Sequence, residues 1–219
     1  MKGNQQALVS PVVAFAHVLV VVVTALVLVW LLHFREGLAF NTHIKPKIFN
    51  IHPLLMIVGF ILLGGEAILA YKTVPGARKI QKRTHLTLHL VALLTGLIGT
   101  FAVFKYHQDL SIPHFYTLHS WVGLITIILY GLQWLYSIFT FAFPHTKSST
   151  RKKVAPWHIF GGIIIFILGI CAALTGLVEK FTFSKLQREQ EALVMNFTGL
   201  MIVLFSITVG AGVLLPRIN

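Results

Sequence analysis

The sequence predicts an all-α integral membrane protein with six transmembrane helices, and three observations support this fold class. Of the 219 residues, 56% are hydrophobic and only 11% are charged, with a mean hydropathy of +0.82, whereas a soluble domain carries about 25% charged residues. Six apolar runs reach the length of about 20 residues that a helical span needs. Connections between the runs are short, so we expect antiparallel neighbours in a single domain over residues 1–219.

The first run, Val12–Leu32, is longer than the core of a usual signal peptide, and no A-x-A-like cleavage site follows it. We therefore expect it to be a retained span. The other runs are bounded by helix breakers or polar clusters, and Pro113 and Pro156 stand where proline suits the start of a helix. These five runs are His52–Tyr71, Thr84–Phe104, Leu118–Phe141, Pro156–Val178 and Leu193–Leu215.

The net charge of +12 is explained by membrane topology rather than by nucleic-acid binding. Eleven of the 18 Lys and Arg residues fall on the side that receives the N-terminus, the loops around residues 72–83 and 145–155, and the C-terminus. Because loops rich in Lys and Arg stay in the cytoplasm, we expect both termini of this multi-pass protein to be cytoplasmic. We expect no nucleic-acid partner.

Four of the 11 histidines open four consecutive predicted helices. His52 and His119 should lie at similar depth near the outer face, and His85 and His158 near the inner face. His89 follows one turn after His85. A single histidine at a helix end is ordinarily an interfacial residue whose ring reaches water, but two pairs matched in depth across four helices indicate a functional role.

Small residues share the helical face of these histidines when each helix is read at 100° per residue. They leave space inside the bundle, although small residues also let membrane helices approach closely. The one ionisable group near the middle is Glu66, about 40° from His52 on the same helix by this count. The small residues are Gly59, Ala92, Gly96, Gly99, Gly162, Gly169, Ala172 and Gly176.

Neutral imidazole binds zinc, copper or haem iron. A zinc or proton transporter would place its ligands near the bilayer midplane. Paired histidines beside glycines instead suit a planar macrocycle held on both faces, and iron with two histidine ligands favours electron transfer because no position is open to oxygen. His85 should lie level with about residue 69 of the second helix, roughly 25 Å from His52. A non-redox histidine-based metal transporter, and a haem-containing membrane anchor that passes electrons to a partner protein, stay open as alternatives.

Five stretches contain these histidines and their neighbours. Their combination of histidine spacings with the LHSW motif resembles the cytochrome b-561 family of ascorbate-dependent transmembrane electron carriers, over nearly the whole chain. The stretches are FNIHPLLMIVGF (Phe49–Phe60), KRTHLTLHLVALL (Lys82–Leu94), AVFKYH (Ala102–His107), YTLHSWVGL (Tyr116–Leu124) and PWHIFGG (Pro156–Gly162).

The resemblance implies a central four-helix bundle of helices 2–5 that encloses two b-type haems (haem b), usually in a homodimer. It implies an oxidoreductase that passes electrons from cytoplasmic ascorbate to monodehydroascorbate or a ferric chelate on the other side. Matched residue by residue, His52 and His119 would ligate the outer haem iron, and His85 and His158 the inner one. His89 matches a position that is His or Asn in the family and so fits a polar role. Members occupy vacuolar, lysosomal, vesicle or plasma membranes.

The inner substrate site should offer cations to the ascorbate anion. Family motifs support Lys72, Arg78, Lys82 and Arg151, although the positive-inside rule alone also fills such loops with Lys and Arg. For the outer acceptor, the loop that leads to His119 offers four candidates, of which His107 matches a family histidine. The four are Lys105, Tyr106, His107 and Tyr116.

Overall fold

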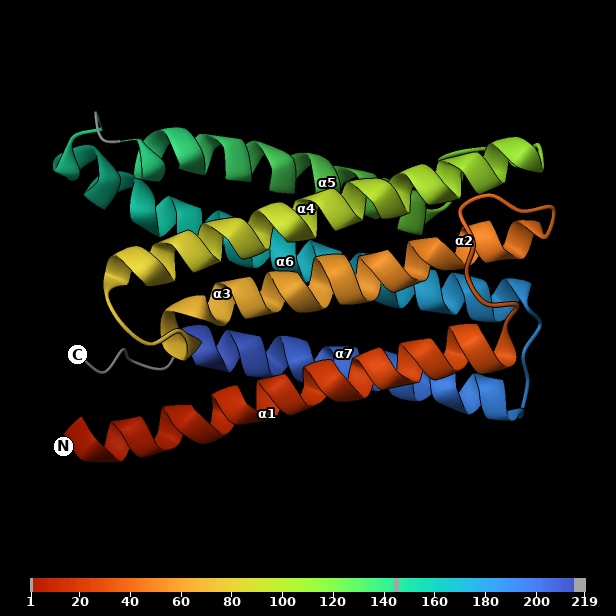
Figure 1. Ribbon diagram of the computed structural model, residues 1–219, viewed down its shortest axis with the longest axis horizontal. Coiled ribbons are helices and arrows are strands. Elements are labelled where there is room, and N and C mark those ends of the chain that lie inside the picture. The colour runs from red at the N-terminus through yellow and green to blue at the C-terminus, as the bar shows by residue number, and fades with distance from the viewer. Residues whose placement is uncertain (1, 144–145, 215–219) are drawn as a thin grey trace.

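The computed structural model describes residues 2–143 and 146–214, which form an all-helical bundle (Figure 1). Three of its six long helices contain a short π-helical segment. Residues 215–219, where the sixth predicted run ends, lie outside the described residues. The elements are α1 (Lys2–Val29) with η1 (Trp30–Phe34); α2 (Lys45–Leu54), η2 (Leu55–Leu62) and α3 (Leu63–Thr73); α4 (Arg78–Asp109); α5 (Leu118–Ser137) with η3 (Ile138–Ala142); α6 (Ser148–Phe183); and α7 (Gln190–Leu214).

All six predicted spans are confirmed as helices long and apolar enough to cross a membrane. The shortest span is Pro11–Phe34, with 24 residues, and the longest is Ser148–Phe183, with 36. Both exceed the length of about 20 residues that a bilayer requires. The chain is therefore a multi-pass membrane protein.

The fifth span begins earlier than its proline suggested. Pro156 lies inside α6, which starts at Ser148. Proline removes one backbone hydrogen bond from a helix, and near a membrane surface water can satisfy the freed carbonyl group. The basic residues before Pro156 are good helix formers, so the helix continues through the proline toward its N-terminus.

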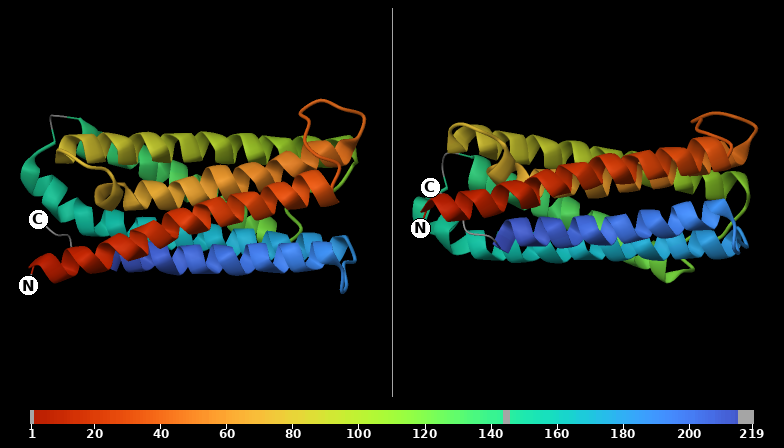
Figure 2. Two further views of the ribbon diagram at one scale, coloured as in Figure 1. Left: turned by 60° about the horizontal axis from the view of Figure 1, so that its bottom comes forward. Right: turned by 90° about the horizontal axis from the view of Figure 1, so that it is seen from below.

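The helices run up and down, and α1 begins at the same end of the bundle at which α7 ends (Figures 1 and 2). The second to fifth spans close into a ring, because α4 contacts α2, η2, α3 and α5, α5 contacts α6, and α6 contacts η2. The first and sixth spans, α1 and α7, pack against each other and against the second span. This ring agrees with the predicted central arrangement of helices 2–5.

The main apolar core lies outside this ring, between α1, α7 and the second span. Its largest fully buried side chains include Trp30, Leu69 and Phe205. The packing there is close: a Cβ added at Gly65 would lie 2.5 Å from the Phe205 ring, and one at Gly212 would lie 2.5 Å from Leu69. The second span is thus held firmly on the face that turns away from the fourth and fifth spans.

The π-helical segments were not predicted, and η2 changes the orientation of the residues that follow it. A π-helix departs from 100° per residue, so the estimated angle between His52 and Glu66 is wrong. Glu66 faces α1, where its carboxylate lies 2.9 Å from Nδ1 of His17. Glu66 therefore belongs to a contact between α1 and α3.

Candidate functional site

Two histidines face each other at the inner end of the ring, His85 from α4 and His158 from α6. Their ring centroids are 6.1 Å apart, with the planes at 71°. Nδ1 of His85 donates a hydrogen bond to the carbonyl of Ala67 (2.8 Å). Nδ1 of His158 lies 3.0 Å from Oγ of Ser137, whose hydroxyl donates to the carbonyl of Gln133, so the hydroxyl accepts from His158. Both rings therefore carry their proton on Nδ1 and keep the lone pair of Nε2 for a ligand bond.

The outer pair repeats this arrangement with His52 from α2 and His119 from α5. The ring centroids are 6.0 Å apart and the planes meet at 86°. Nδ1 of His52 donates to the carbonyl of Gly99 (3.0 Å), and Nδ1 of His119 donates to the carbonyl of Ala172 (2.8 Å). A carbonyl can only accept a hydrogen bond, so Nε2 is again the unprotonated nitrogen on each ring.

The spacing of both pairs suits a metal held between two imidazoles. Metal–nitrogen bonds of about 2.0–2.1 Å on each side place the two nitrogens about 4 Å apart, and the ring centres lie about 1 Å further back, giving about 6 Å between centroids. Hydrogen bonding of the other ring nitrogen is the usual way in which a ligating histidine is oriented. Each pair would supply two ligands to such a metal, and another group would supply the rest.

The inner pair lies beside the part of the second span that was predicted, near residue 69. His85 binds the carbonyl of Ala67, and its ring lies 5.2 Å from that of Tyr71. His52, at the other end of the same span, belongs to the outer pair. The second span therefore connects the two pairs directly.

His89 is close to the inner pair, but it is oriented differently. Its ring centroid lies 4.5 Å from that of His85. Its Nδ1 hydrogen-bonds with the hydroxyl of Tyr130 on α5 at 2.5 Å, and its 4.5 Å spacing from His85 is shorter than the about 6 Å that a metal held between two imidazoles requires. This geometry separates the two histidines, which sequence spacing alone did not.

A cavity of about 790 Å³ contains the inner pair, a size typical of cofactor and ligand sites. Phe60, Tyr130 and Phe166 contribute apolar and aromatic surface at its deep end. The four cations predicted to bind ascorbate all contribute to its lining. The basic and histidine residues of the lining are Lys72, Arg78, Lys82, Arg151, Lys152, His85, His89 and His158.

Two of these cations also bind the backbone at the end of the fourth span. Lys82 donates to the carbonyl of Phe141, and Arg151 donates to the carbonyl of Phe143 (2.9 Å). Carbonyl groups at a helix C-terminus lack intrahelical partners and favour cations. The ring of Phe141 also lies 5.3 Å from that of His158, so these contacts help to fix the position of His158.

The small residues on the histidine faces serve two purposes. On α4 and the second span they allow close approach, because a Cβ added at Gly59 would lie 2.6 Å from Thr95, and one at Gly96 would lie 2.8 Å from Phe60. On α6, Gly162 and Gly169 line the cavity. Both readings of the glycine pattern therefore hold, and on α6 they meet at the same residues, because a Cβ added at Gly162 would lie 3.0 Å from Gln133 and one at Gly169 would lie 3.0 Å from Ile61.

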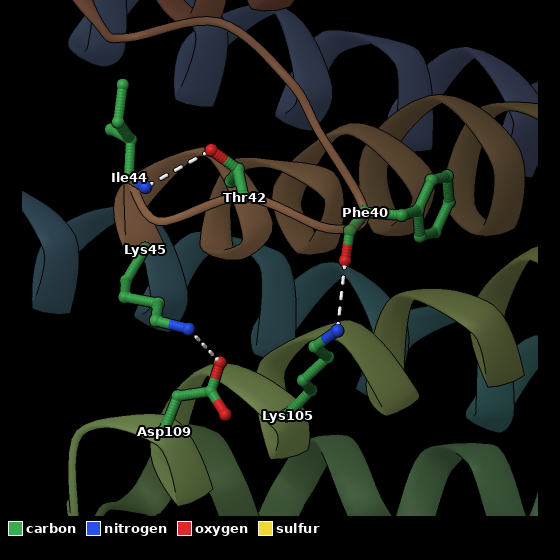
Figure 3. A network of polar contacts seen from close by, with 6 residues as sticks. All are labelled: Phe40, Thr42, Ile44, Lys45, Lys105 and Asp109. Carbon is green, nitrogen blue, oxygen red and sulfur yellow. Dashed lines mark hydrogen bonds and ion pairs between the residues drawn. The ribbon is translucent and has the colours of Figure 1, made fainter.

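At the outer end, the loop between η1 and α2 is tied to the end of α4 (Figure 3). Nζ of Lys105 donates to the carbonyl of Phe40 (3.2 Å), and Lys45 forms an ion pair with Asp109 (2.7 Å). The hydroxyl of Thr42 accepts a hydrogen bond from the backbone amide of Ile44. Lys105, predicted at the acceptor site, thus anchors this loop.

Of the other outer candidates, Tyr106 is linked to the histidine pair through Phe49. Its ring is 5.2 Å from that of Phe49, which in turn is 6.3 Å from His52. His107 stacks on His114, with centroids 5.3 Å apart and planes at 20°. Tyr116 is exposed.

Sequence reasoning missed one charged residue at this end, Lys180 of α6. Its Nζ lies 4.5 Å from the centroid of the Phe49 ring. The signal that could have found it is helical spacing, because Lys180 follows Gly176 by one turn. A Cβ at Gly176 would lie 2.7 Å from the ring of His119.

The sequence is similar to those of known proteins. Residues 51–184 match the family eukaryotic cytochrome b561. The chain is 44% identical over 212 residues to a probable ascorbate-specific transmembrane electron transporter 1 of Oryza sativa subsp. japonica, covering 94% of this chain and 91% of the relative. It is 40% identical to a transmembrane ascorbate ferrireductase 2 of Arabidopsis thaliana (94% and 92% covered) and 37% identical to a transmembrane ascorbate-dependent reductase of Sus scrofa (90% and 79% covered).

Proposed function

The chain belongs to the eukaryotic cytochrome b561 family, and from this membership we propose that it carries electrons across a membrane from ascorbate to an acceptor on the opposite side. The observation that carries the proposal is the pair of opposed imidazole sites, 6.0 and 6.1 Å between centroids, with every Nδ1 engaged in a hydrogen bond. These sites lie at opposite ends of one bundle of spans.

In this proposal each site holds one b-type haem. His52 and His119 would hold the outer iron, and His85 and His158 the inner iron. A haem with two histidine ligands supplies one-electron oxidation and reduction of its iron without an open position for oxygen. The cavity of about 790 Å³ beside His85 and His158 supports the inner assignment. At the outer site Gly176 supports it, because any larger residue would meet the His119 ring.

The inner cations bind and orient the reductant. Ascorbate is a small anion at neutral pH, and Lys72, Arg78, Lys82 and Arg151 line the cavity that contains the inner pair. A guanidinium can hold two anionic oxygens in a fork, and an ammonium adds a point charge. Lys82 and Arg151 each also bind a backbone carbonyl. These hydrogen bonds hold the two charged groups at the cavity and restrict the motion of their side chains.

On the outer side, the acceptor is a ferric chelate or monodehydroascorbate. Tyr106 and His107, with Lys105 and Tyr116 nearby in the chain, form its proposed surroundings. We take the end that receives the termini as cytoplasmic, from the excess of Lys and Arg there. A homodimer and the identity of the membrane stay predictions from the family resemblance.

The histidine pairs also bear on the two alternatives. A structural or transported zinc ion takes about four protein ligands, whereas these sites bring two side chains each, which suits a metal whose other ligands belong to a macrocycle. A haem-containing anchor would share the histidine pairs but would have no need of a cationic cavity beside the inner one. The cavity therefore favours direct reaction with a small anionic reductant.

A reduced-minus-oxidised absorbance spectrum of the purified protein tests this function. We expect b-type bands, and rapid reduction by ascorbate alone. Protein without b-type bands would refute the haem sites and favour the transporter. Bands that appear with dithionite but not with ascorbate would refute the ascorbate site and favour the anchor.

A further inference from the structure

The ammonium of Lys180 lies in an unusual position at the outer end of α6. Its Nζ is 4.5 Å from the centroid of the Phe49 ring, and the side chain is half-buried. Within residues 2–143 and 146–214, none of the three ion pairs involves Lys180. A half-buried cation without a carboxylate partner is costly, and the ring face offsets only part of that cost.

Nearby carboxylates do not neutralise this cation. Glu36 and Glu191 lie within electrostatic range of Lys180. Glu191, however, pairs with Arg35 at 2.5 Å and accepts a hydrogen bond from Nε1 of Trp30 at 2.9 Å. Glu36 is exposed. The local charges therefore leave a positive centre at Lys180.

Helical periodicity places this centre beside the outer histidine pair. Ala172, Gly176 and Lys180 follow one another at intervals of four residues and so lie along one face of α6. The carbonyl of Ala172 accepts from His119, and a Cβ at Gly176 would meet the His119 ring. Lys180 is the next residue of this face toward the outer surface.

The second span contributes the aromatic ring that the Lys180 ammonium contacts. Phe49 precedes His52 by about one turn, on its outer side, and the two rings are 6.3 Å apart. Because the ammonium lies over Phe49, it stands about one turn outward of His52 along the second span and one turn outward of Gly176 along α6. An anion that entered here would meet a positive charge on the outer side of the histidine pair.

We propose that Lys180 binds an anionic oxygen at the outer histidine pair. This inference rests on the proposed function. Two sources share the chemistry: a propionate carboxylate of the outer haem, or an oxygen of the anionic electron acceptor. In either case Lys180 positions the reaction partners at the outer end, as a partner of the bound group rather than as an iron ligand.

Three variants test the proposal. Lys180→Gln removes the charge and keeps a polar side chain. Lys180→Arg restores the charge, and Arg188→Gln removes one positive charge from an exposed position on the same side. Each protein is purified with its haems, titrated to obtain the midpoint potential of each haem, and reconstituted into liposomes loaded with ascorbate, with ferric-EDTA added outside.

The two sources give different results. If Lys180 binds a propionate, Lys180→Gln should lower the midpoint potential of one haem and leave the other unchanged, because the carboxylate loses its counter-charge. If it binds the acceptor, both potentials should stay at the wild-type value while the KM for ferric-EDTA rises about tenfold, as for the loss of a charge-assisted hydrogen bond. Lys180→Arg should return either quantity toward wild type.

The proposal is overturned if Lys180→Gln matches Arg188→Gln in both potentials and in KM. That outcome would leave Lys180 as a side chain that only packs on Phe49. A failure of the proposed function would give another result. In that case ascorbate would not reduce the haems of the wild-type protein at all.

Discussion

Gly176→Ala should selectively weaken the outer haem site. The added Cβ would lie 2.7 Å from Cε1 and 2.8 Å from Nδ1 of His119, whereas ordinary contacts begin near 3.4 Å. The ring would have to move by about 0.7 Å, and the Nδ1 bond to Ala172 that orients it would lengthen. Overpacking of this kind costs about 1–3 kcal/mol, which corresponds to a roughly 5- to 150-fold loss in affinity for the outer haem.

The assay is the haem-to-protein ratio of the purified variant, with Gly210→Ala as the matched control. Gly210 is exposed on α7, outside the ring of spans that contains the histidine pairs, and a Cβ there meets nothing within 4 Å. We expect Gly176→Ala to lose outer haem while ascorbate still reduces the inner one, and Gly210→Ala to keep both. A Gly176→Ala protein with two haems of unchanged potential would refute the assigned role of His119.

Further predictions concern the ligands and the two substrate sites. Alanine at one ligand should remove one haem from the absorbance spectrum, the outer for His52 or His119 and the inner for His85 or His158. His89→Ala should keep both haems, and loss of the inner haem in this variant alone would reverse the ligand assignment. His107→Ala in ascorbate-loaded liposomes should slow reduction of an external acceptor but not of the haems; unchanged turnover would remove His107 from the acceptor site. Lys82→Ala and Arg151→Ala should each raise the ascorbate concentration needed for rapid haem reduction about ten- to a hundredfold, with dithionite reduction unaffected, and wild-type ascorbate kinetics would contradict anion binding.

The six spans and the pairing of the histidines could be predicted from the lengths of the apolar runs and from the positions of the histidines within them. The six runs and the short loops fix which helix ends share a face, so the depth of each histidine could be read from its place in its run. Proximity of His52 to His119, and of His85 to His158, follows from that depth. The choice between His85 and His89 came from family resemblance, because both lie on one face of the helix.

The partners of the histidines could not be predicted from residue types. Ala67, Gly99 and Ala172 contribute backbone carbonyls, which every residue has, so nothing in their side chains marks them. Glu66 was misplaced because a π-helical segment rotates whatever follows it. The carbonyl contacts of Lys82 depend on where η3 ends, which hydropathy does not determine.

The second span bears on the choice between electron transfer and transport. It carries His52 and, through the carbonyl of Ala67, orients His85. It is packed closely on both faces, by Thr95 of α4 against Gly59 and by Phe205 of α7 against Gly65. Close-packed interiors resist continuous deformation, so the spacing between the two histidine pairs is fixed.

A fixed spacing suits electron transfer, which needs two sites at a constant separation and no moving part. Alternating-access transport instead requires one group of helices to rock against another around a site near the midplane. Here the described histidine pairs lie toward the two ends, and the span that joins them is held between α4 and α7. Rocking the second span would break the contacts of Gly59 or Gly65 and move the carbonyl that orients His85. The packing of this one span therefore favours a static path for electrons over a moving path for ions.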